Sequence, residues 1–389
     1  MRFASAISTA AEADRAVAEV LKSLRAGPAV SPDVAFVFFT GHHNPSAERL
    51  VERLWLKLDP QCMVGCSGEG VLGGDLEVER QPGLAVLVGQ TPGVQLHPFH
   101  IGDDLDWRHV LTDEDELTER VGYGPLTRGV IGFGDPFSTP VSQFLAALDG
   151  ACPNAPLVGG MASSGREPGT NLVVRNDQVF DEGFVGVSLS GPLRVEPVVS
   201  QGCRPIGKPM VITKSHDNVI EQLGGRPALE MLRQTVNAIG PQEEKLLANG
   251  LFVGRAISEY RESFGRGDFL VRNVIGVSEA DGTVSAADYV RTGQTVQFQV
   301  RDAATAGEDL AALLEARRSG EPPAGALLFS CNGRGTRMFD VACHDIGQAR
   351  RNLPQTPVAG FFAAGEFGPV GGKNFIHGHT ASLALFRPE

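Results

Sequence analysis

The sequence predicts a mixed α/β fold (α+β), with two related domains whose mixed parallel and antiparallel sheets are flanked by helices. The first observation behind this is a strand–polar loop–helix–strand–glycine loop–strand pattern that occurs three times. The second is a stretch of apolar runs at hairpin spacing between the second and third copies. The third is the length of 389 residues with 42% hydrophobic side chains, which suits two or three domains with buried cores.

The first copy of the pattern follows an expected N-terminal helix over Thr9–Arg25, whose start resembles a capping box at Thr9 and Glu12. A buried strand over Val34–Phe39 ends in a polar loop, and Pro45 then opens a helix, because proline suits the first helical position. The glycine loop and the third strand of this copy are expected at Gly65–Gly70 and Leu84–Val88.

The second and third copies have the same parts in the same order. In the second copy, the first strand is Val130–Phe133, the polar loop is Gly134–Phe137 and the helix starts at Pro140. The glycine loop is Gly159–Gly165 and the last strand is Phe184–Leu189. In the third copy, the first strand is Ala326–Phe329, the polar loop is Ser330–Gly335 and the helix starts at about Thr336. The glycine loop is Gly360–Gly368 and the last strand is His379–Phe386. Any α/β protein alternates strands and helices, but here the small-residue second loop recurs as well, which favours internal repeats.

Antiparallel structure is expected between the second and third copies. The predicted elements are a hairpin of Pro209–Thr213 with Val219–Leu223, a hairpin of Val284–Val290 with Thr295–Val300, and a helix over Asp302–Arg317. A boundary near residues 205–220 divides the chain into an N-terminal helix at residues 1–29, an N-terminal domain at 30–210 and a C-terminal domain at 211–389.

Composition narrows the class of protein. The formal net charge of −12 argues against a nucleic-acid partner, because phosphate neutralisation needs clustered Lys and Arg. The longest strongly apolar run, Val34–Phe39, is far shorter than the roughly 20 residues that span a bilayer. The six cysteines contain no C-x-x-C pair, so a disulfide framework is not expected. These features predict a reduced cytoplasmic protein that binds no membrane and no nucleic acid.

Two glycine motifs resemble nucleotide-binding loops without their context. Gly68–Gly73 matches G-x-G-x-x-G, but no helix can open before the next strand, as the dinucleotide fingerprint requires. Gly371–Lys373 lacks the upstream glycine of a phosphate loop, and Asn374 stands where that motif has Ser or Thr. No histidines are spaced as metal ligands on a helix, so neither a metal nor a cofactor is predicted.

Charged residues in the strand-end loops are the candidate ligand site. Glu366 and Glu69 lie in glycine loops and suit either acid–base work or capture of an ammonium group, although both could be ordinary surface charges. Arg334 could hold a carboxylate through its bidentate fork. We expect Arg334 and Glu366 to line one pocket. The full set of predicted ligand-binding residues is Asn332, Arg334, Glu366, Asn374, His377, Glu69, Ser67 and Asp135.

Cys331 is a possible nucleophile. It follows a strand and lies near Arg334, which could lower the pKa of its thiol. A small buried cysteine at a strand end is the simpler interpretation, since no orienting group is evident. A nucleophilic cysteine needs a base within about 2.6–3.2 Å, and we predict that no histidine or carboxylate approaches the Cys331 sulfur in that way.

Several segments resemble the FIST proteins, named for F-box and intracellular signal transduction. Gly360–Gly372, followed by Asn374–His377 and Thr380–Leu385, is similar to the C-terminal signature of that family, and Ser330–Gly335 and Asp268–Gly276 match further motifs. The N-terminal FIST half is matched by Gly65–Gly70, Val158–Gly160, Gly186–Gly191 and Val199–Gly207. The resemblance covers about residues 30–386. It implies a sensory module for small ligands, amino acids among them.

The leading functional hypothesis is a stand-alone cytoplasmic sensory module that binds a small polar, amino-acid-like ligand and signals through a partner protein. The alternative is a cysteine-dependent hydrolase or transferase that uses Cys331. A purely structural adaptor would instead leave the polar loops dispersed. The sequence favours a binding protein over an enzyme.

Overall fold

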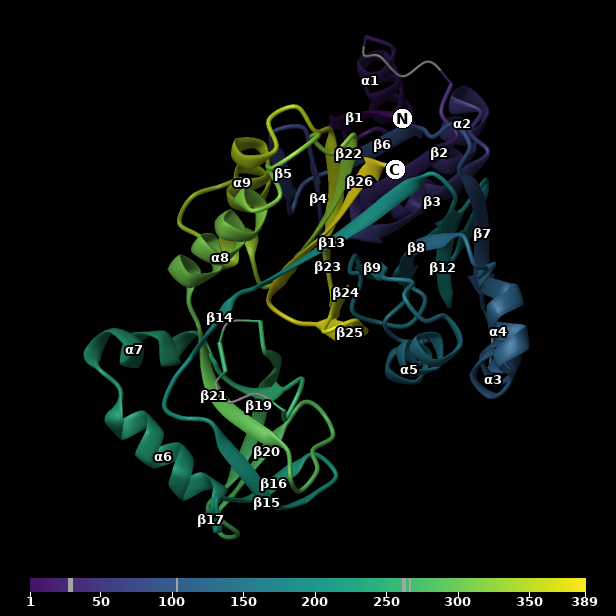
Figure 1. Ribbon diagram of the computed structural model, residues 1–389. Coiled ribbons are helices and arrows are strands. Elements are labelled where there is room, and N and C mark those ends of the chain that lie inside the picture. The colour runs from purple at the N-terminus through teal and green to yellow at the C-terminus, as the bar shows by residue number, and fades with distance from the viewer. Residues whose placement is uncertain (27–30, 103, 261–263, 266) are drawn as a thin grey trace. The chain divides into compact units, whose positions relative to one another are not determined.

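The computed structural model describes residues 1–26, 31–102, 104–260, 264–265 and 267–389. These form two compact units. The three-sheet unit comprises Met1–Val199, Leu310–Ile376 and Thr380–Glu389, and the inserted unit comprises Ser200–Asp309 and His377–His379. Parallel and antiparallel strands occur together with helices, so the predicted mixed fold class is confirmed (Figure 1).

The three-sheet unit contains three sheets with one strand order. The first sheet has the order β1-β6-β2-β3-β10-β11, with the parallel pair β2 and β3 at its centre. Its strands are β1 (Arg2–Ser8), β6 (Leu84–Gln90), β2 (Val34–Thr40), β3 (Cys62–Gly68), β10 (Val173–Arg175) and β11 (Gln178–Phe180). Strand β2 is buried along its whole length, because helices cover one face and the other two sheets cover the other.

The second and third sheets repeat this order. The second sheet is β7 (Gln95–Ile101), β12 (Phe184–Ser190), β8 (Thr127–Gly134), β9 (Leu157–Met161), β24 (Glu366–Val370) and β25 (Lys373–His377). The third sheet is β13 (Leu193–Gln201), β26 (Thr380–Pro388), β22 (Gly325–Cys331), β23 (Val358–Ala363), β4 (Gly70–Gly73) and β5 (Leu76–Glu79). Both have a central parallel pair, so the predicted internal repeats are confirmed.

The three repeats exchange hairpins in a cycle. The β4–β5 hairpin of the first repeat completes the third sheet, and the β24–β25 hairpin of the third repeat completes the second sheet. The β10–β11 hairpin of the second repeat completes the first sheet. Each sheet therefore needs strands from two repeats, and the loop after each second parallel strand leads into a neighbouring repeat.

One glycine marks the same position in every repeat. Gly65, Gly159 and Gly360 lie on the second parallel strand opposite Val37, Gly132 and Leu328. A Cβ atom at any of the three would overlap the carbonyl oxygen of the opposing residue, so only glycine permits this approach of the strands. The shared register allows residues of the three repeats to be matched.

Three equivalent phenylalanines bring the inner faces of the sheets together. Phe38, Phe133 and Phe329 each follow the residue opposite the marker glycine. Their ring centroids are 5.3 Å (Phe38–Phe133), 5.7 Å (Phe133–Phe329) and 6.1 Å (Phe38–Phe329) apart, in edge-to-face contact. The repeats therefore share one central core.

Helices cover the outer faces of the sheets (Figure 1). The first sheet carries α1 (Ala13–Arg25) and α2 (Ala47–Leu58), the latter after the 3₁₀ turn η1 (Gly41–Ser46). The second sheet carries α3 (Asp104–Thr112), α4 (Glu114–Val121) and α5 (Val141–Ala151). The third sheet carries α8 (Ala303–Glu315) and α9 (His344–Asn352), with the turn η3 (Gly335–Arg337) before α9.

The inserted unit is built on a mainly antiparallel sheet. Its strands are β14 (Cys203–Pro205), β15 (Met210–His216), β16 (Val219–Leu223), β17 (Arg226–Pro227), β18 (Leu251–Ala256), β19 (Phe269–Ser278), β20 (Thr283–Ala286) and β21 (Thr295–Arg301). Its helical elements are α6 (Ala228–Ala238), α7 (Pro241–Leu246) and η2 (Leu247–Asn249). The β15–β16 hairpin is confirmed. The second predicted hairpin is wrong, because β20 pairs with β19 and β16 while β21 pairs with β18.

Two predicted helix starts are also wrong. The first helix begins at Ala13 and its N-cap is Glu12, whose side chain makes no capping bond, so Thr9 and Glu12 form no capping box. The preceding Arg2–Ser8 is a strand that pairs with β6. The helix predicted from about Thr336 begins at His344, because the chain first makes a short 3₁₀ turn over Gly335–Arg337.

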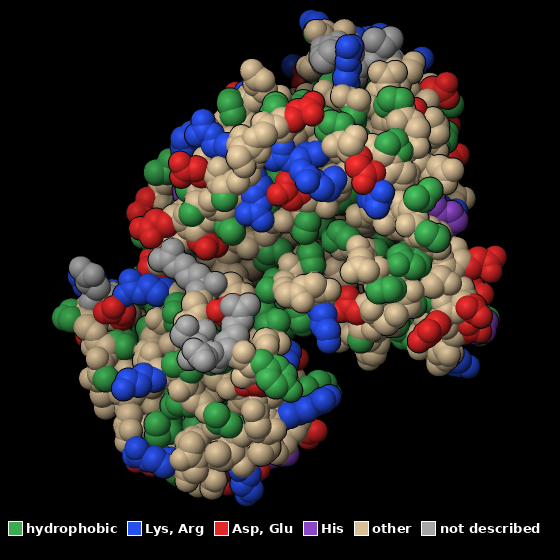
Figure 2. All heavy atoms as spheres, viewed as in Figure 1, with side chains coloured by type: hydrophobic (Ala, Val, Ile, Leu, Met, Phe, Trp, Pro, Cys, Tyr) green, Lys and Arg blue, Asp and Glu red, His purple; other side chains and the backbone are tan. Residues whose placement is uncertain are grey.

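Acidic and basic side chains are interspersed over the described residues of the face drawn in Figure 2. Within the described part of the chain, no helix is long and apolar enough to cross a membrane.

Candidate functional site

In the third repeat, polar side chains cluster at positions where the other two repeats have different residue types. Glu366 lies opposite Gly160, directly after a marker glycine, and the equivalent positions in the other hairpins hold Val71 and Val173. Two residues after the core phenylalanine, the third repeat has Cys331 where the others have Thr40 and Asp135. Matching the repeats by their strand register thus identifies a cluster in the third repeat that the other two repeats do not have.

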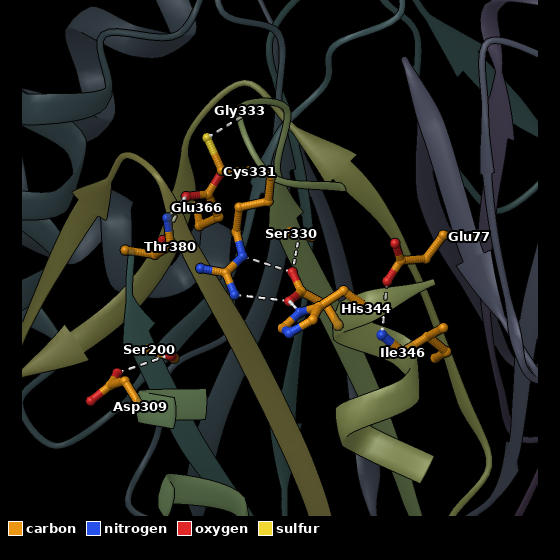
Figure 3. Close-up of polar contacts among 12 residues, drawn as sticks. Glu77, Ser200, Asp309, Ser330, Cys331, Gly333, His344, Ile346, Glu366 and Thr380 are labelled. Carbon is orange, nitrogen blue, oxygen red and sulfur yellow. Dashed lines mark hydrogen bonds and ion pairs between the residues drawn. The ribbon is translucent and has the colours of Figure 1, made fainter. Parts of the chain in front are cut away.

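The centre of the cluster is a buried ion pair. Arg334 and Asp345 are both fully buried, and the Arg334 Nε and Nη2 atoms donate to the two Asp345 carboxylate oxygens at 2.7 and 2.8 Å. Ser330 Oγ donates to the same carboxylate at 2.6 Å, and His344 Nδ1 lies 2.9 Å from its other oxygen (Figure 3). Burial raises the pKa of Asp345, but the Arg334 guanidinium outweighs it and holds the carboxyl well below its usual range.

Arg334 was expected to bind a ligand carboxylate through its fork. That fork already holds Asp345, so the side chain is a structural cation with two of its donors committed inside the protein. Its guanidinium carbon also lies 5.2 Å from the Phe339 ring centroid. The ligand-binding role predicted for this residue does not fit its surroundings.

Glu366 lies beside Cys331 and Thr380 (Figure 3). Thr380 donates to Glu366 Oε2 from Oγ1 at 2.6 Å and from its backbone nitrogen at 3.3 Å. The other oxygen, Oε1, is buried and meets no nitrogen or oxygen donor among the described residues. Burial raises the pKa of Glu366 to about 8, against hydrogen bonds from Thr380 and Cys331 and the charge of Arg334, which lower it.

The Cys331 thiol interacts with Glu366 and lowers the pKa of that acid, so a carboxyl group does lie near the sulfur. That no base lies within about 2.6–3.2 Å of the sulfur stays a prediction. The Gly333 backbone nitrogen also donates to Cys331 Sγ at 3.4 Å. The Arg334 charge also acts on Glu366 and lowers its pKa. Both residues are fully buried, and a ligand pocket that they share stays a prediction.

The first repeat adds three more carboxyl groups around the third-repeat loop, two of them on its exchanged hairpin. Glu77 Oε1 accepts from the Ile346 backbone nitrogen at 2.8 Å, and burial, with Asp345 nearby, raises the pKa of Glu77 to about 8. Glu79 accepts from the Thr336 backbone nitrogen and hydroxyl at 3.0 and 2.9 Å. The third is Glu69, which precedes β4. Contacts between repeats thus hold this loop in place.

Glu69 lies at the surface end of the cluster. Its carboxylate pairs with Arg337, whose Nη1 lies 2.9 Å from Oε2 and also donates to the Asn332 carbonyl at 2.8 Å. Glu69 and the exposed Arg80 both line an open cavity of about 450 Å³. The other residues around this cavity are Gly41, His42, Asn44, Gly68, Ser164, Gly165 and Thr170. Glu69, Arg80, Asn332 and Arg337 also border a much smaller opening beside it.

The other predicted site residues have structural partners. Ser67 Oγ accepts from the Leu172 backbone nitrogen at 2.8 Å and shares a hydrogen bond with Ser164 at 2.7 Å. Asp135 accepts from the backbone nitrogens of Phe137 and Ser138, within its own loop.

Asn374 fixes the exchanged hairpin of the third repeat, since its Oδ1 accepts from the Leu157 backbone nitrogen at 2.8 Å and its Nδ2 donates to Asp149 at 2.8 Å. His377 is counted with the inserted unit and is buried.

Sequence reasoning missed Asp345, Thr380, Arg337 and Arg80. Arg337 is three residues after Arg334, and its charge just beyond the polar loop Ser330–Gly335 was a usable signal. Arg80 has a left-handed backbone with φ of 56°, which is uncommon for a residue with a side chain. Nothing local marks Asp345 or Thr380 as partners of the cluster, because folding alone brings them there.

Two family domains match most of the chain in comparisons with known proteins. Residues 33–226 match the FIST N domain, and residues 228–369 match the FIST C domain. An uncharacterized protein of Mycobacterium tuberculosis strain H37Rv is 39% identical over 99% of this chain and 100% of its own length. An uncharacterized protein of Mycobacterium bovis is 38% identical over 99% of each chain.

Among solved structures, the crystal structure of a cyanuric acid hydrolase from A. caulinodans aligns at 11% identity with a TM-score of 0.37, covering 100% of this chain and 99% of that one. The two domain matches and the full-length relatives agree with each other. This chain belongs to the FIST family.

Proposed function

We propose that this FIST protein is a cytoplasmic sensory module that binds a small zwitterion of the amino-acid type and signals through a partner protein. FIST domains are associated with the sensing of small ligands in signal transduction, which supports the class of function. The observation that carries the proposal is the open cavity at which a carboxylate, Glu69, and a guanidinium, Arg80, occur together.

The cavity has the size and lining for a small polar ligand. Its volume of about 450 Å³ falls in the range of roughly 300–1,000 Å³ typical of ligand sites. Its wall offers hydroxyl, amide and imidazole groups in addition to the two charges. An amino-acid-like ligand must satisfy both an ammonium and a carboxylate, and here each finds an opposite charge.

Arg80 suits the carboxylate end of such a ligand. It is exposed, and the described residues give it no ion pair, so its bidentate fork is open to an anion. A non-glycine residue held in a left-handed conformation costs on the order of 1–3 kcal/mol. An arginine at this position is thus retained for its side chain rather than for its backbone preference.

Glu69 suits the ammonium end and connects the cavity to the third repeat. It now pairs with Arg337, which also holds the Asn332 carbonyl in the loop after Cys331. A ligand ammonium would compete with Arg337 for this carboxylate and loosen its hold on that loop. This competition gives a route by which occupancy of the cavity changes a surface that a partner protein could read.

Calorimetric titration with the twenty amino acids tests this function. We expect Glu69→Gln and Arg80→Gln each to weaken binding of the best ligand at least about tenfold, which corresponds to 1.4 kcal/mol. The matched controls Glu52→Gln and Arg318→Gln change exposed residues away from the cavity and should bind as the native chain does.

Modified ligands assign each charge to its partner. The N-acetyl form lacks the ammonium, so it should bind the native chain more weakly than the free amino acid does, and this difference should disappear in Glu69→Gln. The methyl ester lacks the carboxylate, so its weaker binding to the native chain should disappear in Arg80→Gln. The proposal is wrong if no amino acid binds, or if both variants bind as tightly as the native chain.

A further inference from the structure

The position of Glu366 is one that the fold fills with valine elsewhere. Val71 and Val173 occupy the equivalent position in the other two hairpins, and both are fully buried in the central core. Glu366 is equally buried, with 0% exposure. Burying an ionisable group is costly and valine would serve the packing, so the carboxyl group is the feature that needs a reason.

The residue at the position of Cys331 also has a different role in the third repeat from that in the other two. In the first repeat, Thr40 Oγ1 accepts from the Gly83 backbone nitrogen at 2.9 Å, and in the second, Asp135 accepts from nitrogens of its own loop. Cys331 instead interacts with Glu366 through its thiol, and its sulfur accepts from the Gly333 backbone nitrogen at 3.4 Å. Where the other two repeats use this position to satisfy loop backbone, the third places a nucleophilic atom against an acid.

Thr380 completes the same pattern. It lies two residues before the strand partner of Phe329, and the equivalent residues of the other repeats are Gly83 and Gly183. Its hydroxyl and backbone nitrogen both bind Glu366 Oε2 and fix that oxygen. The second oxygen is left without a nitrogen or oxygen donor in the described part of the chain. Three coordinated differences between the repeats therefore build one site.

We propose that Cys331 and Glu366 form a thiol–carboxylic acid pair that captures a small aldehyde or ketone as a reversible hemithioacetal or hemithioketal. The Cys331 sulfur forms a bond to the carbonyl carbon while the carbon–oxygen π bond breaks. Glu366 gives its proton to the carbonyl oxygen and receives the proton of the thiol. All atoms and electrons balance, and no further reactant is needed.

The surroundings of the pair favour this addition. Glu366 is protonated at neutral pH, because burial raises its pKa to about 8, so a proton is available to the carbonyl oxygen. Cys331 and Arg334 are described residues with titratable or charged groups that act on Glu366. The Arg334 charge acts on both partners and stabilises negative charge that develops on the sulfur or on oxygen. Cys331 is 9% exposed, at the outer side of the cluster.

Addition is also the step that this pair can complete alone. A cysteine-dependent hydrolase or transferase, the alternative from the sequence, must also expel a leaving group and admit a second nucleophile. The proposal does not depend on Glu69 or Arg80, so it and the proposed sensory function can fail separately.

Carbon-13 NMR with [1-¹³C]acetaldehyde tests the pair directly. The native chain is expected to give a hemithioacetal resonance that Cys331→Ser abolishes. The control Cys343→Ser removes a partly exposed thiol outside the pair and should keep the resonance. The thiols of Cys62 and Cys152 are not expected to contribute, since burial raises their pKa values to about 12. No resonance, or one that persists in Cys331→Ser, would overturn the proposal.

The role of the acid is measured by comparing two reactions of Cys331. Glu366→Gln should slow aldehyde capture by about 10²–10⁴-fold, the usual contribution of general acid–base catalysis, while alkylation by iodoacetamide, which needs no proton from Glu366, is retained. Glu366→Val, which installs the residue of the other repeats, should behave in the same way and keep the fold. If both variants slow capture and alkylation by the same factor, Glu366 has only a structural role and the proposal is wrong.

Discussion

Replacing Asp345 by alanine is expected to lower the free energy of unfolding by about 3–5 kcal/mol, the cost of leaving a buried charge without its partner. Arg334 has no exposed surface and directs two donors at this carboxylate, so water cannot replace the lost group. Ser330 and His344 lose the same acceptor. Urea unfolding at neutral pH measures the change.

Two controls separate the buried charge from a general effect of mutation. Asp75→Ala breaks the exposed pair of Asp75 with Arg350 and should cost no more than about 1 kcal/mol. The double variant Arg334→Met with Asp345→Leu removes both charges and should be more stable than Asp345→Ala alone. Equal losses in Asp345→Ala and Asp75→Ala would show that the Arg334 charge is not isolated from solvent.

The native chain is expected to lose stability as pH rises from about 5 to above 8, and Glu366→Val to lose less. The pKa of Glu366 is raised from 4.5 to about 8, so the folded chain keeps a proton that the unfolded chain has released. Stability is therefore fully present below the unfolded value and falls as pH rises through the folded one. A shift of this size corresponds to on the order of 5 kcal/mol at high pH.

Glu77 provides the matched comparison for this prediction. Burial and the nearby Asp345 raise the pKa of Glu77 to about 8 as well, so it contributes a slope of the same sign. Urea unfolding from pH 5 to 9 should show that Glu366→Val and Glu77→Gln each flatten part of the dependence. A Glu366→Val curve parallel to that of the native chain would mean that Glu366 ionises normally in the folded state.

The three repeats could be predicted from the sequence because each contains its own local signals. A buried apolar run, a polar loop, a helical stretch and a glycine loop recur within about 30 residues in each copy. The exchange of hairpins could not be predicted, because the signal for a short strand such as Gly70–Gly73 does not specify which sheet it joins. Gly65, Gly159 and Gly360 could be recognised as glycines in the sequence. Their role in permitting close approach of the strands could not be predicted, because it depends on which residue lies opposite them.

The candidate site was predicted in part for similar reasons. Cys331, Arg334 and Glu366 were recognised because they are polar residues at strand ends, and the parallel strands bring them together. Their partners were not recognised, because Asp345 lies at the start of a helix and Thr380 at the start of a strand. Without Asp345, Arg334 resembled a ligand-binding residue, and without the register of the repeats, Glu366 was preferred to Glu69 only because it shares a strand–helix–strand unit with Arg334.

The central claim of this account is that the third repeat replaces a core valine with a neutral buried acid beside a thiol. Carbon-13 NMR of the glutamate side-chain carboxyl groups, with Glu366→Gln to assign the resonance, measures this most directly. A midpoint near pH 8 for Glu366 is the predicted result, since burial dominates its surroundings. A midpoint near 4.5, with the carboxylate ionised at neutral pH, would contradict the claim.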